Sequence, residues 1–203
     1  MLEVHIHGAA LDELVAIGRF AAQRDWVPAT SGNFSRRLDA HHIAITRSGV
    51  DKGLLGPDDF ATVHLARPIP PGVSAETPLH VARYRNDPAV GAVVHIHSLA
   101  ATVLSRAFAA EGAIELEGFE MHKALSGFTT HESTVRVPIF ANAQDTEELA
   151  RTVETSIAGN GVPGYLLAGH GLYAWGDTMD QARRHVEGLE FLLRCTLEER
   201  RLS

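Results

Sequence analysis

Two short histidine motifs contain the residues best suited to do chemistry together. The first is the pair His95 and His97, which ends an apolar run beginning at Val90. The second is His170, which has a glycine on each side and apolar runs before and after it. Side chains alternate faces along a strand, so His95 and His97 should point the same way, with Cα atoms roughly 6.6 Å apart. Two imidazoles at that spacing can share a metal ion, and His170 would complete an open site.

Neither histidine motif alone is specific for a metal. A histidine pair in a strand can be buried and hydrogen-bonded to the backbone, and a histidine between glycines can lie in a hairpin turn. The glycines would equally let the backbone bring an imidazole close to an ion. We expect six further histidines at the surface: His5, His7, His41, His42, His64 and His185.

Small hydroxyl residues stand beside glycines in two segments, 30–33 and 46–49. Such segments expose backbone N–H groups and hydroxyls, which can form a nest for a phosphate or an oxyanion. Two ordinary turns are the alternative interpretation. The candidate anion-binding residues, including a lysine and a further serine nearby, are Ser31, Gly32, Asn33, Ser48, Gly49, Lys52 and Ser74.

Two glutamates are candidates for proton transfer. Glu76 lies just before an expected helix start at Thr77 and Pro78, where the helix dipole favours a carboxylate without any catalytic role. Glu120 precedes a short apolar segment and is either a general acid/base or a solvated helix residue. Spacing alone does not choose between these interpretations.

Length and composition set broad limits on the protein class. The 203 residues predict one domain, spanning 1–203, with a substantial core. The net charge of -7 without a basic run argues against a nucleic-acid partner. No segment has the signature of a membrane span or a signal peptide, so we expect a cytoplasmic protein. Cys195 is the only cysteine, which excludes an intrachain disulfide and a thiolate zinc cluster.

Helices and short strands alternate along the chain, with several short strand-to-strand connections. This order argues against a regular parallel sheet, and we expect an α/β fold, a three-layer α/β/α sandwich with a central, largely antiparallel sheet. The predicted helices cover about 9–25, 77–86, 99–108, 145–158 and 178 onward. The predicted strands cover about 33–37, 42–46, 60–65, 90–97, 136–140, 165–168 and 172–175.

The motifs also occur in a recognisable order. Residues 31–33, 46–49, 74–76, 95–97 and 169–171 follow one another as in the class II aldolase/epimerase family, which includes adducin-like proteins. The chain resembles this family over nearly its whole length. Segments 74–80 and 117–127 resemble the branch that removes water from a thioether-bearing ketose 1-phosphate in methionine salvage.

The resemblance implies a class II aldolase-like fold and one Zn²⁺ per subunit, held by His95, His97 and His170. It implies that the phosphate of a ketose 1-phosphate lies against the glycine- and hydroxyl-rich loops. Glu120 is then the first candidate for the catalytic acid/base. Glu76 is the second, because its counterpart in the aldolases of the family is the base.

The remaining implications concern substrate, assembly and competing activities. Phe119 and Met121 would line a wall for the thioether, with core packing as the alternative. Family members are commonly homotetramers with sites near subunit boundaries, so we expect a homotetramer. A class II sugar-phosphate aldolase or a 4-epimerase uses the same kind of site, and an adducin-like module would keep the fold without catalysis. The presence of all three histidines and both glutamates favours an enzyme.

Overall fold

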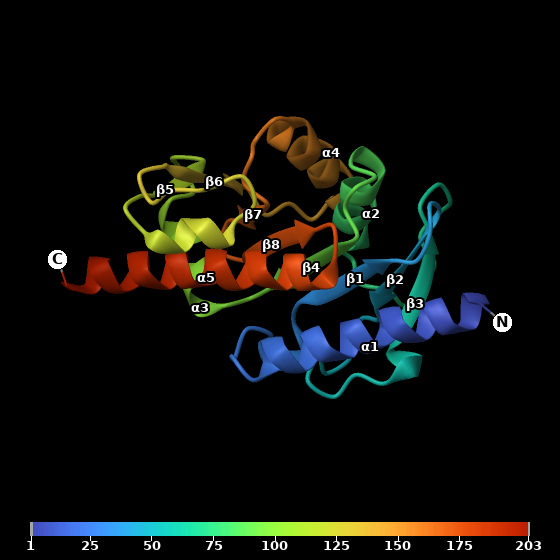
Figure 1. Ribbon diagram of the computed structural model, residues 1–203. Coiled ribbons are helices and arrows are strands. Elements are labelled where there is room, and N and C mark those ends of the chain that lie inside the picture. The colour runs from blue at the N-terminus through green and yellow to red at the C-terminus, as the bar shows by residue number, and fades with distance from the viewer. Residues whose placement is uncertain (1, 203) are drawn as a thin grey trace.

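An eight-stranded sheet forms the middle layer of the protein (Figure 1). The computed structural model describes residues 2–202, with side chains from residue 8 onward. The strands, in chain order, are β1 (Asn33–Arg37), β2 (His42–Thr46), β3 (Phe60–His64), β4 (Ala92–Ile96), β5 (Ala113–Leu116), β6 (Val135–Phe140), β7 (Gly164–Leu167) and β8 (Gly171–Gly176). Their order across the sheet is β3-β2-β1-β4-β8-β7-β6-β5, and only the pair β6 and β7 is parallel among these described strands. The expected largely antiparallel sheet is confirmed.

Helices cover both faces of this sheet. The helices, including three short 3-10 segments, are α1 (Leu2–Ala22), η1 (Pro28–Thr30), η2 (Pro57–Asp59), α2 (Thr77–Asn86), α3 (Leu99–Ala107), η3 (Glu120–Ala124), α4 (Thr146–Ile157) and α5 (Met179–Leu202). Apolar side chains of α1, α3 and α5 form one core with the sheet, and those of α2 and α4 form a second core. The three-layer α/β/α sandwich is therefore confirmed. None of the described helices combines the length and apolar character needed to cross a membrane.

The alternation of side chains along β4 determines which helix layer its histidines face. Val94 and Ile96 point into the core beneath α1, α3 and α5. Val93 points into the other core, beneath α2 and α4. Because side chains two apart share a face, His95 points with Val93 toward the layer of α2 and α4. The N-terminal ends of those two helices therefore border the histidines, and their neighbouring loops can contribute to the same site.

The structure differs from the sequence predictions at three places. Helix α1 begins at Leu2 rather than near residue 9, and no proline interrupts this earlier stretch. Strand β5 was not predicted, although its side chains alternate buried and exposed from Ile114 to Leu116. His185 is buried rather than at the surface, whereas His41 is exposed and the other described members of the predicted surface set are half-buried. The side chains of residues 5 and 7 lie outside the described part of the chain.

Candidate metal centre

Three histidines and one glutamate from three segments of the chain converge at one end of the sheet. Their ligand atoms all lie within 4.8 Å of one another. The Nε2 atom of His95 lies 2.9 Å from that of His97 and 3.3 Å from that of His170, and the latter two are 3.1 Å apart. Glu76 Oε1 lies 2.8 Å from His170 Nε2, and Glu76 Oε2 lies 3.5 Å from His95 Nε2. The three predicted ligands are thus brought together, with Glu76 beside them.

The hydrogen bonds behind the histidines determine which ring nitrogens face inward without a proton. His95 Nδ1 lies 3.1 Å from the carbonyl oxygen of Leu172, which can only accept, so this Nδ1 donates. His170 Nδ1 lies 3.2 Å from Asn142 Oδ1 and donates in the same way. In a neutral imidazole the other nitrogen then carries a lone pair. The Nε2 atoms of both rings therefore point lone pairs at the centre of the cluster.

The close spacing of these lone pairs is the arrangement expected around a bound cation. Buried Glu76 Oε1 has no hydrogen-bond donor among the described residues, although it lies 2.8 Å from His170 Nε2. Four ligand atoms around a tetrahedral zinc ion at 2.0–2.1 Å would be spaced by roughly 3.3 Å, close to the spacings between the imidazoles. The ring orientations are also set by outer partners, as is usual for metal-binding histidines. The residues present fit a divalent metal ion.

Burial keeps the imidazoles of His95 and His97 in the neutral form that binds metal. Burial lowers the pKa of His95 well below its usual value, and it lowers that of His97 to about 4. The positive form of each ring is therefore disfavoured at neutral pH. A metal ion would not have to displace protons from these two rings when it binds there.

A glycine permits the close approach that brings His170 to the cluster. Gly171 starts β8, which pairs with β4. A Cβ atom at this position would collide with the carbonyl oxygen of Ile96 and lie 3.1 Å from Cε1 of His95. Only glycine therefore allows the two strands to pack at this point, and the tight turn before it places His170 opposite the histidines of β4.

The side chain of Glu76 contacts the histidine cluster and does not cap its own helix. It occupies the N-cap position of α2 but makes no cap hydrogen bond there with its side chain. Instead its Oε2 accepts a hydrogen bond of 2.6 Å from Asn33 Nδ2. Burial alone would raise the pKa of Glu76, but His95, His170 and the Asn33 hydrogen bond together hold it well below its usual range. An ionised carboxylate therefore lies beside the three imidazoles.

A cavity of about 370 Å³ opens beside the cluster and is lined by His97, His170 and Glu76. The same cavity is lined by all seven candidate anion-binding residues: Ser31, Gly32, Asn33, Ser48, Gly49, Lys52 and Ser74. The two glycine-containing segments thus lie on the same cavity as the histidines. A single ligand can contact both groups.

The loop of residues 30–33 is held in a conformation that suits anion binding. Ser31 Oγ is buried and has no hydrogen-bond partner within the described chain. Gly32 has a positive φ of 73°, a conformation that favours glycine. Lys52 Nζ donates to the carbonyl oxygens of Thr30 and Val50 at 2.7 and 2.8 Å. An ammonium has three N–H groups, so one remains for a ligand.

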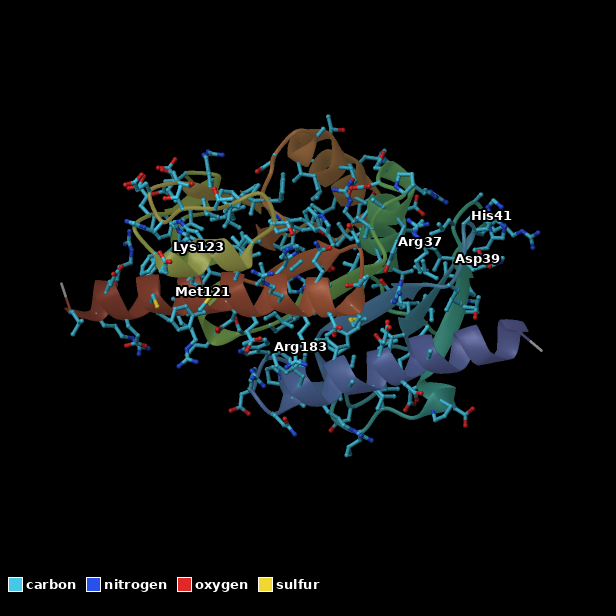
Figure 2. The ribbon with its side chains drawn as sticks, viewed as in Figure 1. Arg37, Asp39, His41, Met121, Lys123 and Arg183 are labelled. Carbon is cyan, nitrogen blue, oxygen red and sulfur yellow. The ribbon has the colours of Figure 1, made fainter. Side chains whose placement is uncertain are left out.

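The structure places Glu120 away from this cavity. It lies at the start of η3, is exposed, and pairs with Lys123 and with His131. It does not line either cavity that borders the histidine cluster. Met121 is 39% exposed in the same segment (Figure 2), and Phe119 packs against the core beneath α5. Within one chain, this segment does not contribute to the cavity.

The structure adds residues that the sequence analysis missed. Asn142, Gln144 and Thr146 line the cavity from the segment that leads into α4. Asn142 could have been found as a polar residue soon after a buried strand, since such positions often border a site. Tyr173 stacks on His95 with ring centroids 3.9 Å apart, and only the pairing of β4 with β8 reveals that contact.

Comparison with known proteins assigns a family to this fold and site. Residues 12–197 match the model of the class II aldolase and adducin N-terminal domain, and the chain belongs to this family. The crystal structure of L-fuculose-1-phosphate aldolase from Thermus thermophilus has a TM-score of 0.79 and 29% identity, covering 94% of each chain. The class II aldolase-like fold is therefore confirmed.

Two relatives with higher identity carry one name. A methylthioribulose-1-phosphate dehydratase of Sorangium cellulosum is 50% identical over 196 residues, which cover 94% of this chain and 92% of the relative. A methylthioribulose-1-phosphate dehydratase of Xanthomonas campestris is 52% identical over 185 residues, covering 89% and 84%. The resemblance to the dehydratase branch is confirmed over most of the chain.

Proposed function

We propose that this chain is a metal-dependent lyase that removes water from 5-methylthioribulose 1-phosphate, giving 2,3-diketo-5-methylthiopentyl 1-phosphate in methionine salvage. The observation that carries the proposal is the single cavity that two of the three clustered histidines share with Glu76 and the two anion-binding loops. The names of relatives about half identical over most of the chain support the choice of substrate. We propose one Zn²⁺ per subunit and a cytoplasmic location.

The proposed reaction balances as the loss of one water. The proton on C3 is removed, and the C4 hydroxyl leaves as water after taking up a proton. The resulting enol gains a proton at C4 and loses one from its C3 hydroxyl. A divalent ion held by the histidines supplies Lewis acidity toward the substrate carbonyl.

The side chains of the cavity divide the remaining tasks. Glu76 is ionised and half-buried beside the histidines, so it can accept the C3 proton. Ser31, Ser48 and Lys52 bind the phosphate, which fixes the distance between C3 and Glu76. Glu120 remains the candidate donor to the departing hydroxyl, and its exposure in one chain means that it would act on the site of a neighbouring subunit.

Assembly into a homotetramer would bring such a residue to the site. Leu99 and Val103 lie on one face of α3, which starts next to His97, and they are 66% and 41% exposed. Large exposed apolar side chains of this kind are common at subunit interfaces. Leu99 also lines a second cavity that reaches His97 and His170. An interface on α3 would therefore lie beside the metal centre.

Replacing Ser31 by alanine should weaken phosphate binding without slowing the chemical step. A hydrogen bond to a charged group contributes about 1.5–3 kcal/mol, so we expect KM to rise at least about tenfold while kcat stays within about twofold. Initial rates against substrate concentration measure both. Ser156→Ala, on the exposed side of α4, is the matched control. A lower kcat with an unchanged KM would contradict the phosphate role.

The reaction itself is tested with purified protein of known metal content. We expect incubation with 5-methylthioribulose 1-phosphate to give a product lighter by one water, detected by mass spectrometry. Chelation should abolish turnover and Zn²⁺ should restore it. Two fragments would indicate an aldolase, and an isomer of unchanged mass an epimerase. Absence of both stoichiometric metal and turnover would indicate a non-catalytic adducin-like module.

A further inference from the structure

A buried chain of hydrogen bonds leads away from Glu76 into the core. Asn33 Nδ2 donates to Glu76 Oε2 at 2.6 Å, and Asn33 Oδ1 lies 2.5 Å from His80 Nε2. His80 Nδ1 lies 2.7 Å from Ser35 Oγ, which lies 3.0 Å from the hydroxyl of Tyr84. The four residues behind Glu76 are at most 2% exposed. Water therefore does not compete for these hydrogen bonds.

The residues of this hydrogen-bond chain come from helix α2 and strand β1, and the spacing along each element places them on one face. Helix α2 supplies His80 and Tyr84, which follow Glu76 at steps of four residues and so lie on one helix face. Strand β1 supplies Asn33 and Ser35, two residues apart and on one strand face. Packing α2 against β1 interleaves the two rows. The order of contacts thus alternates between helix and strand.

The orientation of the Asn33 amide sets the direction of the other hydrogen bonds. Its NH₂ group donates to Glu76 Oε2, so its oxygen faces His80. That oxygen only accepts, so His80 must donate from Nε2. Burial lowers the pKa of His80 to about 4, so the ring is neutral and carries this one proton. Its Nδ1 therefore accepts from Ser35.

We propose that His80 is a positioning residue for Glu76, because its Nε2–H group locks the Asn33 amide with the NH₂ end toward the carboxylate. The inference rests on the proposed function of Glu76 beside the metal. Without this donor, the buried Asn33 oxygen has no partner, and the amide can rotate and turn its oxygen toward the carboxylate. After this rotation the Asn33 NH₂ group no longer donates to Glu76 Oε2, and the carboxylate loses the donor that holds it in place.

Kinetics of His80 variants separate positioning from general stability. For His80→Phe we expect kcat to fall about 10–100-fold while KM stays within about threefold, because His80 makes no hydrogen bond to the proposed phosphate-binding residues Ser31, Ser48 and Lys52. His80→Gln keeps an N–H donor and should recover kcat to within about fivefold of the unchanged protein. A raised KM with an unchanged kcat, or equal losses in His80→Phe and His80→Gln, would overturn the proposal.

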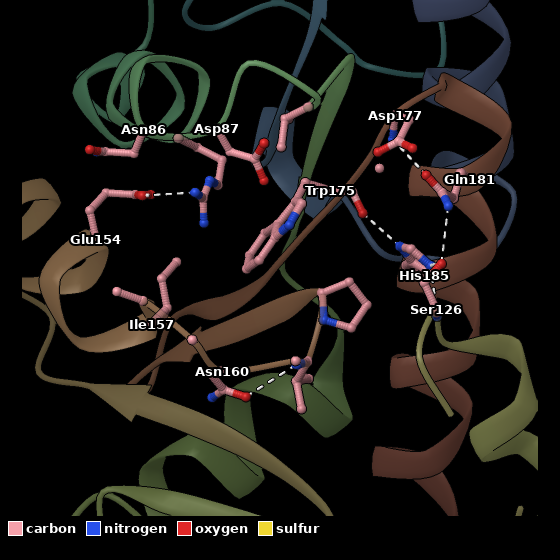
Figure 3. A pocket seen from close by; sticks show the side chains of 18 residues that line it. Asn86, Asp87, Ser126, Glu154, Ile157, Asn160, Trp175, Asp177, Gln181 and His185 are labelled. Atoms are coloured by element: carbon pink, nitrogen blue, oxygen red, sulfur yellow. Dashed lines mark hydrogen bonds and ion pairs between the residues drawn. The ribbon is translucent and has the colours of Figure 1, made fainter. Parts of the chain in front are cut away.

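His185 offers a matched control for removing a buried histidine. It lies on α5 beside a separate cavity of about 500 Å³ (Figure 3). Its Nδ1 donates to the carbonyl oxygen of Trp175 at 2.6 Å, and its Nε2 lies 2.9 Å from Ser126 Oγ. Because it shares no hydrogen bond with Asn33 or Glu76, His185→Phe should leave kcat within about threefold. A loss as large as that of His80→Phe would attribute both effects to stability and overturn the proposal.

A double-mutant cycle tests whether His80 acts through Asn33. We expect Asn33→Ala to lower kcat about as much as His80→Phe, and the double variant to be within about twofold of either one. Losses that multiply would mean that the two residues act separately, which contradicts the proposal.

The same variants can be compared by their metal binding, without substrate. The dissociation constant and the visible absorption spectrum of Co²⁺ report the ligands around the metal. We expect His80→Phe, Asn33→Ala and the double variant to weaken Co²⁺ binding equally, by about tenfold, and His80→Gln by less. Unchanged Co²⁺ affinity and spectrum in His80→Phe would overturn the proposal. If the protein binds Co²⁺ in this pattern but does not dehydrate the substrate, the proposed function fails while the positioning role stands.

Discussion

Replacing His97 by alanine should remove bound metal and catalytic activity together. Only two imidazoles would remain at the centre, since the Nε2 atom of His97 lies 2.9 and 3.1 Å from those of His95 and His170. We expect the metal content per chain to fall at least about tenfold and kcat/KM at least about a thousandfold. Metal analysis of the purified variant, paired with initial rates, measures both losses on one sample.

A thermal measurement checks the metal site independently of activity. Zn²⁺ added to the metal-free protein should raise Tm, because it binds the folded state, and His97→Ala should lose this shift. The control His42→Ala removes a half-buried histidine on β2, far along the sheet from the centre, and should keep the shift. A His97→Ala variant with full metal content would contradict the three-histidine centre.

Glutamine at position 120 should preserve the metal centre and still remove most turnover. Glu120 does not contact the three clustered histidines of its own chain, so we expect unchanged metal content in Glu120→Gln. Loss of a general acid costs about 10²–10⁴-fold in rate, and we expect kcat to fall within this range. The control Glu115→Gln replaces another exposed glutamate of the same region. Near-normal turnover of Glu120→Gln would remove this residue from the mechanism.

Mixing inactive variants tests whether Glu120 serves a neighbouring subunit. Glu120→Gln chains keep the histidines, and His97→Ala chains keep Glu120. If the two are unfolded together and reassembled in equal amounts, random pairing completes about a quarter of the sites. We expect up to that fraction of the original activity to return. No recovery from well-folded mixed oligomers, or a monomer in light scattering, would contradict a site shared between subunits.

The sequence predicted the metal ligands because their signals are local. Strand alternation alone puts His95 and His97 on one face. The glycines around His170 indicate that the backbone there lies close to a neighbouring strand, and the packing of Gly171 against Ile96 confirms this. The hydroxyl- and glycine-rich segments were also readable as anion-binding loops. Each of these motifs works through the conformation of a few consecutive residues, which a sequence pattern can encode.

The roles of the glutamates could not be read in the same way. Glu76 and Glu120 have equally plausible local contexts, each near the start of a short helix. Their difference arises from packing, because α2 lies against β1 and brings Glu76 to Asn33, whereas η3 leaves Glu120 exposed. His80 carried no signal of its own, since its meaning depends on which strand faces its helix.

By itself, the amino-acid sequence determined the family, the layered fold and the three histidines, because periodicity and short motifs act over a few residues. Only the tertiary structure decided that Glu76 joins the histidines, that Asn33 and His80 stand behind it, and that both anion-binding loops share their cavity. Those relations depend on the register of β1 with β4 and on the packing of α2 against the sheet. Both are set by the sum of many weak contacts between distant segments, which no local pattern records.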